Sequence, residues 1–425
     1  MALIELFNSW WKSGSVDPSL APTYRREMFK SVFSHITNRN INLILLISGL
    51  RRVGKSTIMY QAIKRLIEAG VNPLNILYYS FDQKEEELLK ILEEYGSITG
   101  IDWQHEKIYV FFDEIQKLES WGPELKIIYD RFKNIRIIVS GSGSFRLEKE
   151  ALSTLAGRYL LVKANPLKFS EFLDMKGSRI DLKKAKLWDT EINKEFMNYL
   201  YRPFPALVNV GDIGIVKAVI KENVIDKVLK EDIPSIFKEV NPQLLLSLLD
   251  LFYGKPGMYI NYDDLSKDIR VSKKTLMVHV YYMEFAYLIR KIKNYRPSSK
   301  TVSRKLQRIY PYHWGLLFGW NGIVDWETVA ASMLNAKYYW REEGKEADFI
   351  IKNKGITPIE VKEKDDLDND DIAKMAGILK ILEVEKGVFV YSGKEGILHH
   401  GDSRIEKARM PLIEISHREL IQEEE

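Results

Sequence analysis

Short apolar runs alternate with helical patterns in the first part of the chain. The runs cover residues 43–47, 76–80, 108–112 and 135–139. Strands that are apolar along their whole length are typical of a parallel sheet, because helices cover both of its faces. The spacing therefore predicts an α/β domain with a parallel sheet over residues 1–165.

Three further parts are predicted beyond residue 165. Residues 166–241 have a helical pattern with a proline-containing break at 202–205, and we expect a lid or linker region there. Residues 242–308 are predicted to form a helix, a turn, a second helix and a basic hairpin, which is the order of a winged helix. Helix and strand patterns mix again in residues 309–425, which predicts a smaller α/β domain.

The composition is that of a folded protein without cysteine chemistry. Hydrophobic residues make up 45% of the 425 residues, and there is no cysteine. Disulfides, thiolate zinc sites and cysteine nucleophiles are therefore excluded, which fits a reducing cytoplasm. The N-terminus has an early acid, and no apolar run approaches the roughly 20 residues of a membrane helix. We therefore expect a cytoplasmic protein that does not enter a membrane.

The residues after the first apolar run fit a phosphate-binding loop. Residues 49–56 read Gly-Leu-Arg-Arg-Val-Gly-Lys-Ser and match G-x-x-x-x-G-K-[ST] between a predicted strand and a predicted helix. Glycines let backbone N–H groups turn toward phosphate oxygens, and the helix N-terminus adds partial positive charge. The lysine of this motif reaches the β- and γ-phosphates, and the serine binds Mg²⁺. We predict a site for ATP and Mg²⁺ formed by Gly49, Arg52, Val53, Gly54, Lys55, Ser56 and Thr57.

A second strand ends in two acids. The run 108–112 is followed by Asp113 and Glu114. We expect Asp113 to hold Mg²⁺ and Glu114 to activate the attacking water, as a general base or as a positioning group. The glutamate favours a hydrolysing ATPase over a P-loop kinase.

The run 135–139 ends in small polar residues. In ATPases with an inserted strand, such a residue senses the γ-phosphate, so Ser140 or Ser142 is a candidate. A flexible glycine-serine turn is the alternative. Arg158 and Arg146 are candidates for an arginine finger, acting in their own subunit or from a neighbouring one. The alternative is that both are surface arginines.

These motifs and two more resemble those of one ATPase family. The further motifs are 155–158 (Leu-Ala-Gly-Arg) and 166–172 (Pro-Leu-Lys-Phe-Ser-Glu-Phe). The whole set is similar, in the same order, to the AAA+-type predicted ATPases of archaea and bacteria, which carry a winged helix and a C-terminal domain of unknown function. The resemblance implies a P-loop fold with an additional strand, ATP binding and hydrolysis. It does not imply a particular physiological role.

Positive charge is concentrated in the predicted winged helix. Between Arg270 and Arg308 there are eleven Lys or Arg residues and one acid, Glu284, whereas the whole chain has a net charge of only +4. Such a patch is the footprint expected of contact with the DNA backbone. The alternative is a lid or a protein-docking surface. The candidates for DNA contact are Lys273, Lys274, Arg290, Lys291, Lys293 and Arg296.

The C-terminal part contains a loose nuclease-like pattern. Asp348 opens one predicted strand, and Glu360 and Lys362 alternate on the next, so the latter two point to the same face. Two carboxylates there would hold a second Mg²⁺ ion, Lys362 would orient or deprotonate a water, and Glu327 is a further ligand candidate. The arrangement resembles the restriction-endonuclease-like PD-(D/E)XK superfamily. The alternative is an inert charged face used for assembly.

The sequence thus predicts an α/β protein with an AAA+-like P-loop sheet, a winged helix and a restriction-endonuclease-like domain. The predicted function is a Mg²⁺-dependent ATPase that acts on double-stranded DNA or is regulated by it. The rival is a nucleotide-switched regulatory or protein-docking ATPase without DNA contact or nuclease activity. ATP and ADP are the expected ligands, and a homo-oligomer is left open.

Overall fold

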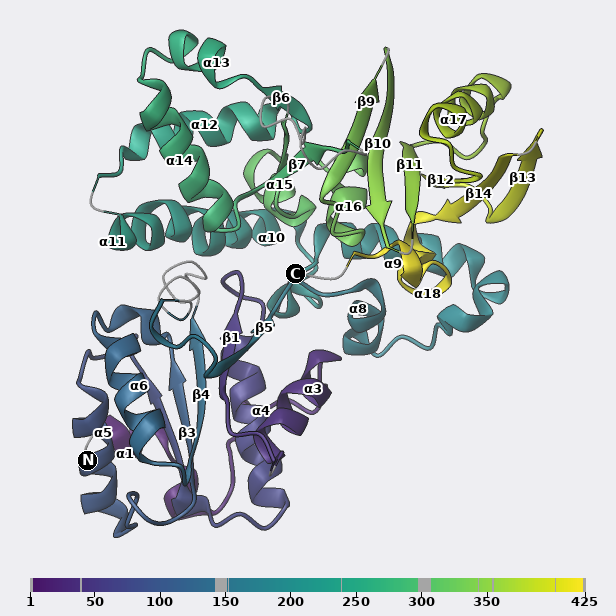
Figure 1. Cartoon of the computed structure of the whole chain (residues 1–425). Coiled ribbons are helices and arrows are strands. Elements are labelled where there is room, and N and C mark those ends of the chain that lie inside the picture. Colours follow the sequence, from purple (N-terminus) through teal and green to yellow (C-terminus); the bar gives the residue numbers. More distant parts are fainter. Residues whose placement is uncertain are drawn as a thin grey trace. The chain divides into compact units, whose positions relative to one another are not determined.

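The computed structural model describes residues 3–38, 40–141, 151, 153–237, 239–296, 307–342, 344–353, 355–401 and 403–422. The chain divides into two compact units, Met1–Pro166 and Leu167–Glu425 (Figure 1). In the described part, none of the helices has both the length and the apolar character needed to span a bilayer.

The first unit is built on a parallel sheet. Its strands run in the order β2-β3-β4-β1-β5. They are β1 (Ile44–Ser48), β2 (Ile76–Ser80), β3 (Ile108–Asp113), β4 (Ile135–Gly141) and β5 (Tyr159–Lys163). Every residue of β1 to β4 is buried, as the apolar runs predicted. Because β4 lies between β1 and β3, the predicted P-loop sheet with an additional strand is confirmed.

Helices cover both faces of this sheet. Figure 1 shows α5 (Leu88–Thr99) and α6 (Trp121–Arg131) on one side, and α3 (Met28–Thr37) and α4 (Lys55–Glu68) on the other. The short helices α1 (Leu3–Phe7) and α2 (Trp10–Ser13) lie at edge strand β2. Between them, Asn8 binds the backbone of Tyr78 through two hydrogen bonds of 2.7 and 2.8 Å, and both indoles of Trp10 and Trp11 donate to Ile76 O. The edge strand is therefore capped by side chains rather than left open.

The second unit contains a mixed sheet of nine strands, in the order β13-β14-β12-β11-β10-β9-β7-β8-β6. The strands are β6 (Met258–Ile260), β7 (Ile289–Asn294), β8 (Gln307–Pro311), β9 (Tyr338–Glu342), β10 (Lys345–Lys352), β11 (Ile356–Lys362), β12 (Lys386–Tyr391), β13 (Gly396–His400) and β14 (Ser403–Arg409). β7 pairs with β9 at Lys293↔Tyr338 and Asn294↔Tyr339. The strands of the basic hairpin and those of the C-terminal part therefore belong to one continuous sheet, and β8 crosses the boundary placed from the sequence between residues 308 and 309.

Helices of the second unit pack on this sheet or on one another. They are α8 (Phe169–Lys176), α9 (Asp189–Tyr201), α10 (Ile213–Ile220), α11 (Ile233–Ile236), α12 (Pro242–Gly254), α13 (Tyr262–Asp268), α14 (Lys273–Phe285), α15 (Trp314–Asn321), α16 (Trp326–Met333), α17 (Asn369–Leu382) and α18 (Ile413–Ser416). π-Helical turns at Lys221–Asp226 and Val228–Asp232 connect α10 to α11. Short 3₁₀ segments occur at Pro73–Asn75, Ile115–Lys117, Leu182–Leu187, Pro205–Leu207, Met410–Leu412 and Arg418–Leu420.

The motif at 166–172 is part of the second unit's core. Phe169 and Phe172 are fully buried, and their rings lie 5.4 and 5.6 Å from that of Tyr199 on α9. Tyr199 in turn contacts the ring of Trp314 on α15 at 5.3 Å. This aromatic cluster joins α8 and α9 to α15, so the motif that carried much of the family resemblance stabilises the fold of the second unit.

Candidate nucleotide site

The backbone of the phosphate-binding loop requires its glycines. Gly49 has φ 148° and Gly54 has φ 92°, and both angles favour glycine. A Cβ atom on Gly49 would lie 2.1 Å from the carbonyl oxygen of Ala164, next to the hydrogen bond of 2.7 Å from Ala164 N to Ser48 O. The loop thus leaves β1 by passing directly against the end of β5.

Lys55 lies at the beginning of α4, with its ammonium group over the loop. The residue is only 5% exposed, and its Nζ donates to Gly49 O at 3.2 Å and to Leu50 O at 3.0 Å. The predicted loop residues Arg52, Val53 and Gly54 lead directly into this helix. A phosphate group in the loop would meet both the ammonium group and the helix N-terminus.

Asp113 is brought to the loop by the order of the strands. Ser56 Oγ donates to Asp113 Oδ2 at 2.5 Å, Tyr78 OH donates to the same oxygen at 2.8 Å, and Ser140 Oγ donates to Asp113 Oδ1. Burial, and then the neighbouring Glu114, raise the pKa of Asp113, whereas the hydroxyl donors oppose this shift. A hydroxyl and a carboxylate are oxygen ligands of the kind that Mg²⁺ prefers, and a cation would favour the ionised carboxylate. The residues present therefore fit a Mg²⁺ ion.

Glu114 lies beside this cluster in an unusual backbone conformation. It has φ 54° and is 8% exposed. Gln116 Nε2, in the turn Ile115–Lys117, donates to Glu114 Oε2 at 2.6 Å. Neither Gln116 nor Tyr78 was predicted as a site residue from the sequence. The position of Gln116, two residues after Glu114, could have indicated its contact with the site. No local pattern indicates Tyr78, because its contact depends on the pairing of β2 with β3.

Arg158 is not at the nucleotide loop. It directly precedes β5, its carbonyl accepts from Ile44 N at the beginning of β1, and its guanidinium pairs with Asp130 of α6 at 2.9 Å. Since β1 and β5 are parallel, this is the edge of the sheet opposite to the loop. A contact of Arg158 with the γ-phosphate in its own subunit is therefore excluded by this geometry. Ser142 and Arg146 lie outside the described residues.

Arg26, which was not predicted as a site residue from the sequence, lies at the phosphate-binding loop instead. Arg26 Nη1 donates to Val53 O at 3.1 Å and to Asn165 O at 2.7 Å, and its Nη2 donates to Pro166 O at 3.1 Å. The phosphate-binding loop is thus linked to the last residues of the first unit. No sequence motif marks Arg26, because its acceptors are backbone carbonyls distant in the sequence.

The predicted acids of the C-terminal part come together around β10 and β11. Val361 N donates to Asp348 Oδ2 at 2.8 Å, and Glu360 Oε2 accepts from Lys374 of α17 at 2.9 Å and lies 3.5 Å from Lys362 Nζ. Burial, then the charge of Asp348, raises the pKa of Glu360 to about 7. Glu360 is 1% exposed, and its Oε1 has no hydrogen-bond partner in the part of the chain that the structure describes. An orphaned buried carboxylate oxygen fits a bound cation, although Lys374 already compensates part of the charge.

Glu327 of α16 borders the same cluster. It pairs with Arg308 of β8 at 2.7 Å and accepts from the hydroxyl of Tyr310. Burial, then Asp348, raises the pKa of Glu327 to about 7. Arg308 therefore connects the strand of the basic hairpin with the acids of the C-terminal part.

A second group of side chains in this unit has potential metal-ligand atoms that lie close together. The ligand atoms of Glu406, His417 and Glu419 all lie within 4.8 Å of one another. However, Lys386 and Arg404 already pair with Glu406 at 2.9 and 2.7 Å. This cluster is therefore compensated by its own cations.

The six basic candidates for DNA contact differ in their surroundings. Arg290 donates to Tyr312 O at 2.8 Å and to Ala331 O at 2.9 Å, and Lys291, 16% exposed, pairs with Glu284 at 2.5 Å. These two side chains are thus occupied within the fold. Arg296 pairs with Glu342 at 2.8 Å, and Lys273 pairs with Asp263 at 2.7 Å on the surface. Lys274 and Lys293 are exposed.

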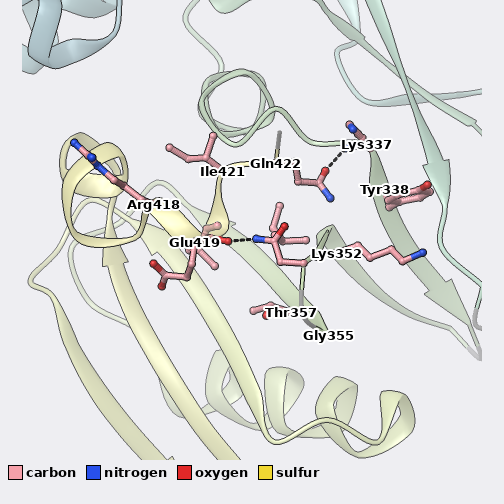
Figure 2. A pocket seen from close by; sticks show the side chains of 12 residues that line it. Lys337, Tyr338, Lys352, Gly355, Thr357, Arg418, Glu419, Ile421 and Gln422 are labelled. Atoms are coloured by element: carbon pink, nitrogen blue, oxygen red, sulfur yellow. Dashed lines mark hydrogen bonds between the residues drawn. The ribbon is translucent and has the colours of Figure 1, made fainter. Parts of the chain in front are cut away.

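The second unit also contains an open pocket of about 840 Å³. It lies between the ends of β9 to β11 and the residues around 418–422, and Figure 2 shows Lys337, Lys352 and Arg418 among its lining. None of the residues predicted from the sequence lines this pocket. The pocket is therefore separate in its residues from the acid cluster around Glu360.

Three family models match the chain. Residues 42–173 match an AAA domain, and residues 193–325 and 323–410 match two domains of unknown function, DUF8612 and DUF4143. The chain is 28% identical to an uncharacterized protein of Haemophilus influenzae, over 60% of this chain and 64% of that protein. It is 29% identical to an uncharacterized protein of Methanocaldococcus jannaschii, over 66% of this chain and 62% of that protein. The chain thus spans less than two thirds of the length of these two relatives.

Solved structures show a distant likeness. A Walker-type ATPase of Pyrococcus abyssi is 16% identical, covers 72% of this chain and 99% of its own, and has a TM-score of 0.45. The ADP form of the ORC2 protein of Aeropyrum pernix is 14% identical, with coverages of 72% and 94% and a TM-score of 0.37. Because both scores are below 0.5, the assignment depends on the AAA domain match and on the strand order of the P-loop sheet. Residues 42–173 therefore match an AAA domain, and the P-loop sheet with β4 between β1 and β3 agrees with that match.

Proposed function

We propose that this chain is a Mg²⁺-dependent ATPase whose hydrolysis is coupled to binding of double-stranded DNA. The observation that carries the first part is the hydrogen bond of 2.5 Å between Ser56 and Asp113, because it brings the two predicted Mg²⁺ ligands together beside the phosphate-binding loop. A bound Mg²⁺ ion would neutralise negative charge on the phosphate oxygens. Lys55 binds the β- and γ-phosphates, and Ser56 and Asp113 hold the ion.

Glu114 is assigned to the attacking water. It follows the metal-binding carboxylate directly and lies at the carboxyl end of β3, the same edge of the sheet as the loop. A carboxylate there accepts the proton of the water or orients it toward the γ-phosphate. Glu114→Gln is expected to bind ATP normally and to lose most of its turnover. Unchanged turnover would remove Glu114 from this role.

The coupling to DNA is proposed from the module that begins with α12. Its elements follow the order α12, β6, α13, α14, β7 and β8, and β8 pairs with both β6 and β7, as in a winged helix. Lys274 lies in the first turn of α14 and Lys293 on β7, both exposed. These cations support contact with the phosphate backbone. The test is the ATPase rate with and without duplex DNA, and stimulation or inhibition by duplex DNA favours the proposal over the docking alternative.

A second divalent-cation site in the C-terminal part is proposed from the unpartnered Glu360 Oε1. Asp348 and Glu360 would bind the ion, and Lys362 would orient a water for phosphodiester hydrolysis. Supercoiled plasmid incubated with Mn²⁺ tests this function. Nicking by the wild type that is lost in Lys362→Ala supports it, and equal nicking by both proteins would indicate a contaminant.

A further inference from the structure

Gln116 has a hydrogen-bond environment that differs from that of a structural glutamine. Its Nε2 donates at 2.6 Å to Glu114, whereas its Oε1 is buried and has no hydrogen-bond partner among the described residues. Gln61, also buried in the first unit, instead donates to two backbone carbonyls, Pro22 O at 2.8 Å and Tyr24 O at 2.5 Å. The amide of Gln61 thus hydrogen-bonds backbone carbonyls, whereas the amide of Gln116 donates to Glu114, the side chain proposed to act on the attacking water.

An unpartnered buried acceptor destabilises a fold, and an apolar side chain of similar shape would avoid this loss. Gln116 is 8% exposed and lies next to the fully buried Ile115. Met has nearly the same length as Gln and packs well in such surroundings. The bond from Gln116 Nε2 to Glu114 Oε2 offsets this loss, so the amide serves the carboxylate rather than the packing around it.

The backbone of the same turn restrains Glu114 as well. Glu114 is held at φ 54°, a conformation that non-glycine residues adopt at a cost, and its carbonyl accepts from Lys117 N at 3.1 Å. The backbone thus sets the direction in which the side chain leaves the strand. The bond from Gln116 to Oε2 then sets the rotation of the carboxylate itself.

We propose that Gln116 is a positioning residue that orients the Glu114 carboxylate for its action on the attacking water. This inference rests on the proposed role of Glu114. Gln116 gains and loses no proton, since its amide only donates to Oε2. Its contribution is to hold the carboxylate in the orientation that accepts the proton of the water, so it affects the chemical step and not the affinity for ATP.

The test compares Gln116→Met with a matched control, Gln61→Met. For Gln116→Met we expect kcat to fall about tenfold to 100-fold, since a well-placed general base contributes about 10²–10⁴-fold. ATP affinity is expected to stay near the wild-type value, and Tm to change little, because the lost bond to Glu114 offsets the removal of the unpartnered oxygen. For Gln61→Met we expect the reverse, a lower Tm and an unchanged kcat. Gln116→Asn keeps the amide donor and is expected to recover part of kcat.

A double variant separates this inference from the role of Glu114. If Gln116 acts through Glu114, adding Gln116→Met to Glu114→Gln should not lower kcat further. Full additivity of the two losses, or a Gln116→Met enzyme with wild-type kcat, would overturn the positioning role while leaving Glu114 in place. A Glu114→Gln enzyme with normal turnover would instead overturn the proposed function itself.

Discussion

Replacing Gly49 by alanine should disrupt the phosphate-binding loop through a direct clash. The added Cβ would lie 2.1 Å from Ala164 O, 3.0 Å from Ala164 C and 3.3 Å from Ala164 Cα. Carbon and oxygen atoms in contact are normally about 3.3–3.6 Å apart. The end of β5 would therefore have to move by more than 1 Å, although Ala164 N is hydrogen-bonded to Ser48 O at 2.7 Å.

The expected cost follows from two separate terms. Forcing an extra methyl group into a packed site costs about 1–3 kcal/mol. Holding alanine at the φ of 148° found for Gly49 costs about 1–3 kcal/mol more. We therefore expect the free energy of unfolding of the first unit to fall by about 2–6 kcal/mol, with weaker ATP binding because the loop is displaced.

Gly100→Ala is the matched control. Gly100 has φ 73° at the end of α5, in the same unit, and no atom of the described residues lies within 4 Å of a Cβ atom placed there. Its replacement should cost only the left-handed conformation, about 1–2 kcal/mol, and should not affect ATP binding.

Hydrogen exchange of the amides in β1 and β5 measures the loss separately from the second unit. Titration with a non-hydrolysable ATP analogue then measures affinity. Equal destabilisation by Gly49→Ala and Gly100→Ala, together with normal affinity in both variants, would refute the reasoning, because the contact with Ala164 would then carry no energy.

Three further outcomes are expected. Lys274→Ala should weaken duplex binding and reduce the slope of log affinity against log salt by about 1, as measured by fluorescence anisotropy. Arg290→Ala should mainly lower Tm, because the Arg290 guanidinium binds backbone carbonyls. An unchanged salt slope for Lys274→Ala would count against DNA contact. Tyr78→Phe removes a 2.8 Å hydrogen bond to Asp113, and a hydrogen bond to a charged group is worth about 1.5–3 kcal/mol. The variant should change the Mg²⁺ dependence of the ATPase rate without abolishing ATP binding. An unaltered Mg²⁺ titration would show that Tyr78 does not act at the site. Burial, then the charge of Arg290, holds the pKa of His313 well below its ordinary value. As pH falls through about 6.5, the unfolded chain takes up a proton at His313 and the folded chain does not. The free energy of unfolding should therefore fall by up to about 1.4 kcal/mol per pH unit below about pH 6.5. His313→Asn keeps an N-cap acceptor and should make this acid-induced loss shallower, as followed by urea denaturation between pH 7 and 5; an identical slope in the variant would exclude His313 as its source.

The sequence by itself determined the candidate nucleotide site of this protein and much of the fold of the first unit. The loop at 49–56 and the acids at 113 and 114 are local patterns, since each function comes from neighbouring residues at the end of one strand. The alternation of apolar runs with helical patterns also predicted the parallel sheet, because a strand buried on both faces leaves a continuous apolar run.

Only the tertiary structure decided which side chains surround those residues. Tyr78 and Ser140 meet Asp113 because β2 and β4 flank β3, and nothing in the local sequence states that order. The parallel pairing of β1 with β5 places Arg158 at the opposite edge of the sheet, away from the loop. In the second unit, the basic sequence predicts Arg290 as a DNA contact, and the structure adds that its guanidinium binds backbone carbonyls 22 and 41 residues away. A motif formed by neighbouring residues can be recognised in the sequence. Contacts between strands cannot, because they depend on the strand order and on the packing of residues that are distant in the sequence.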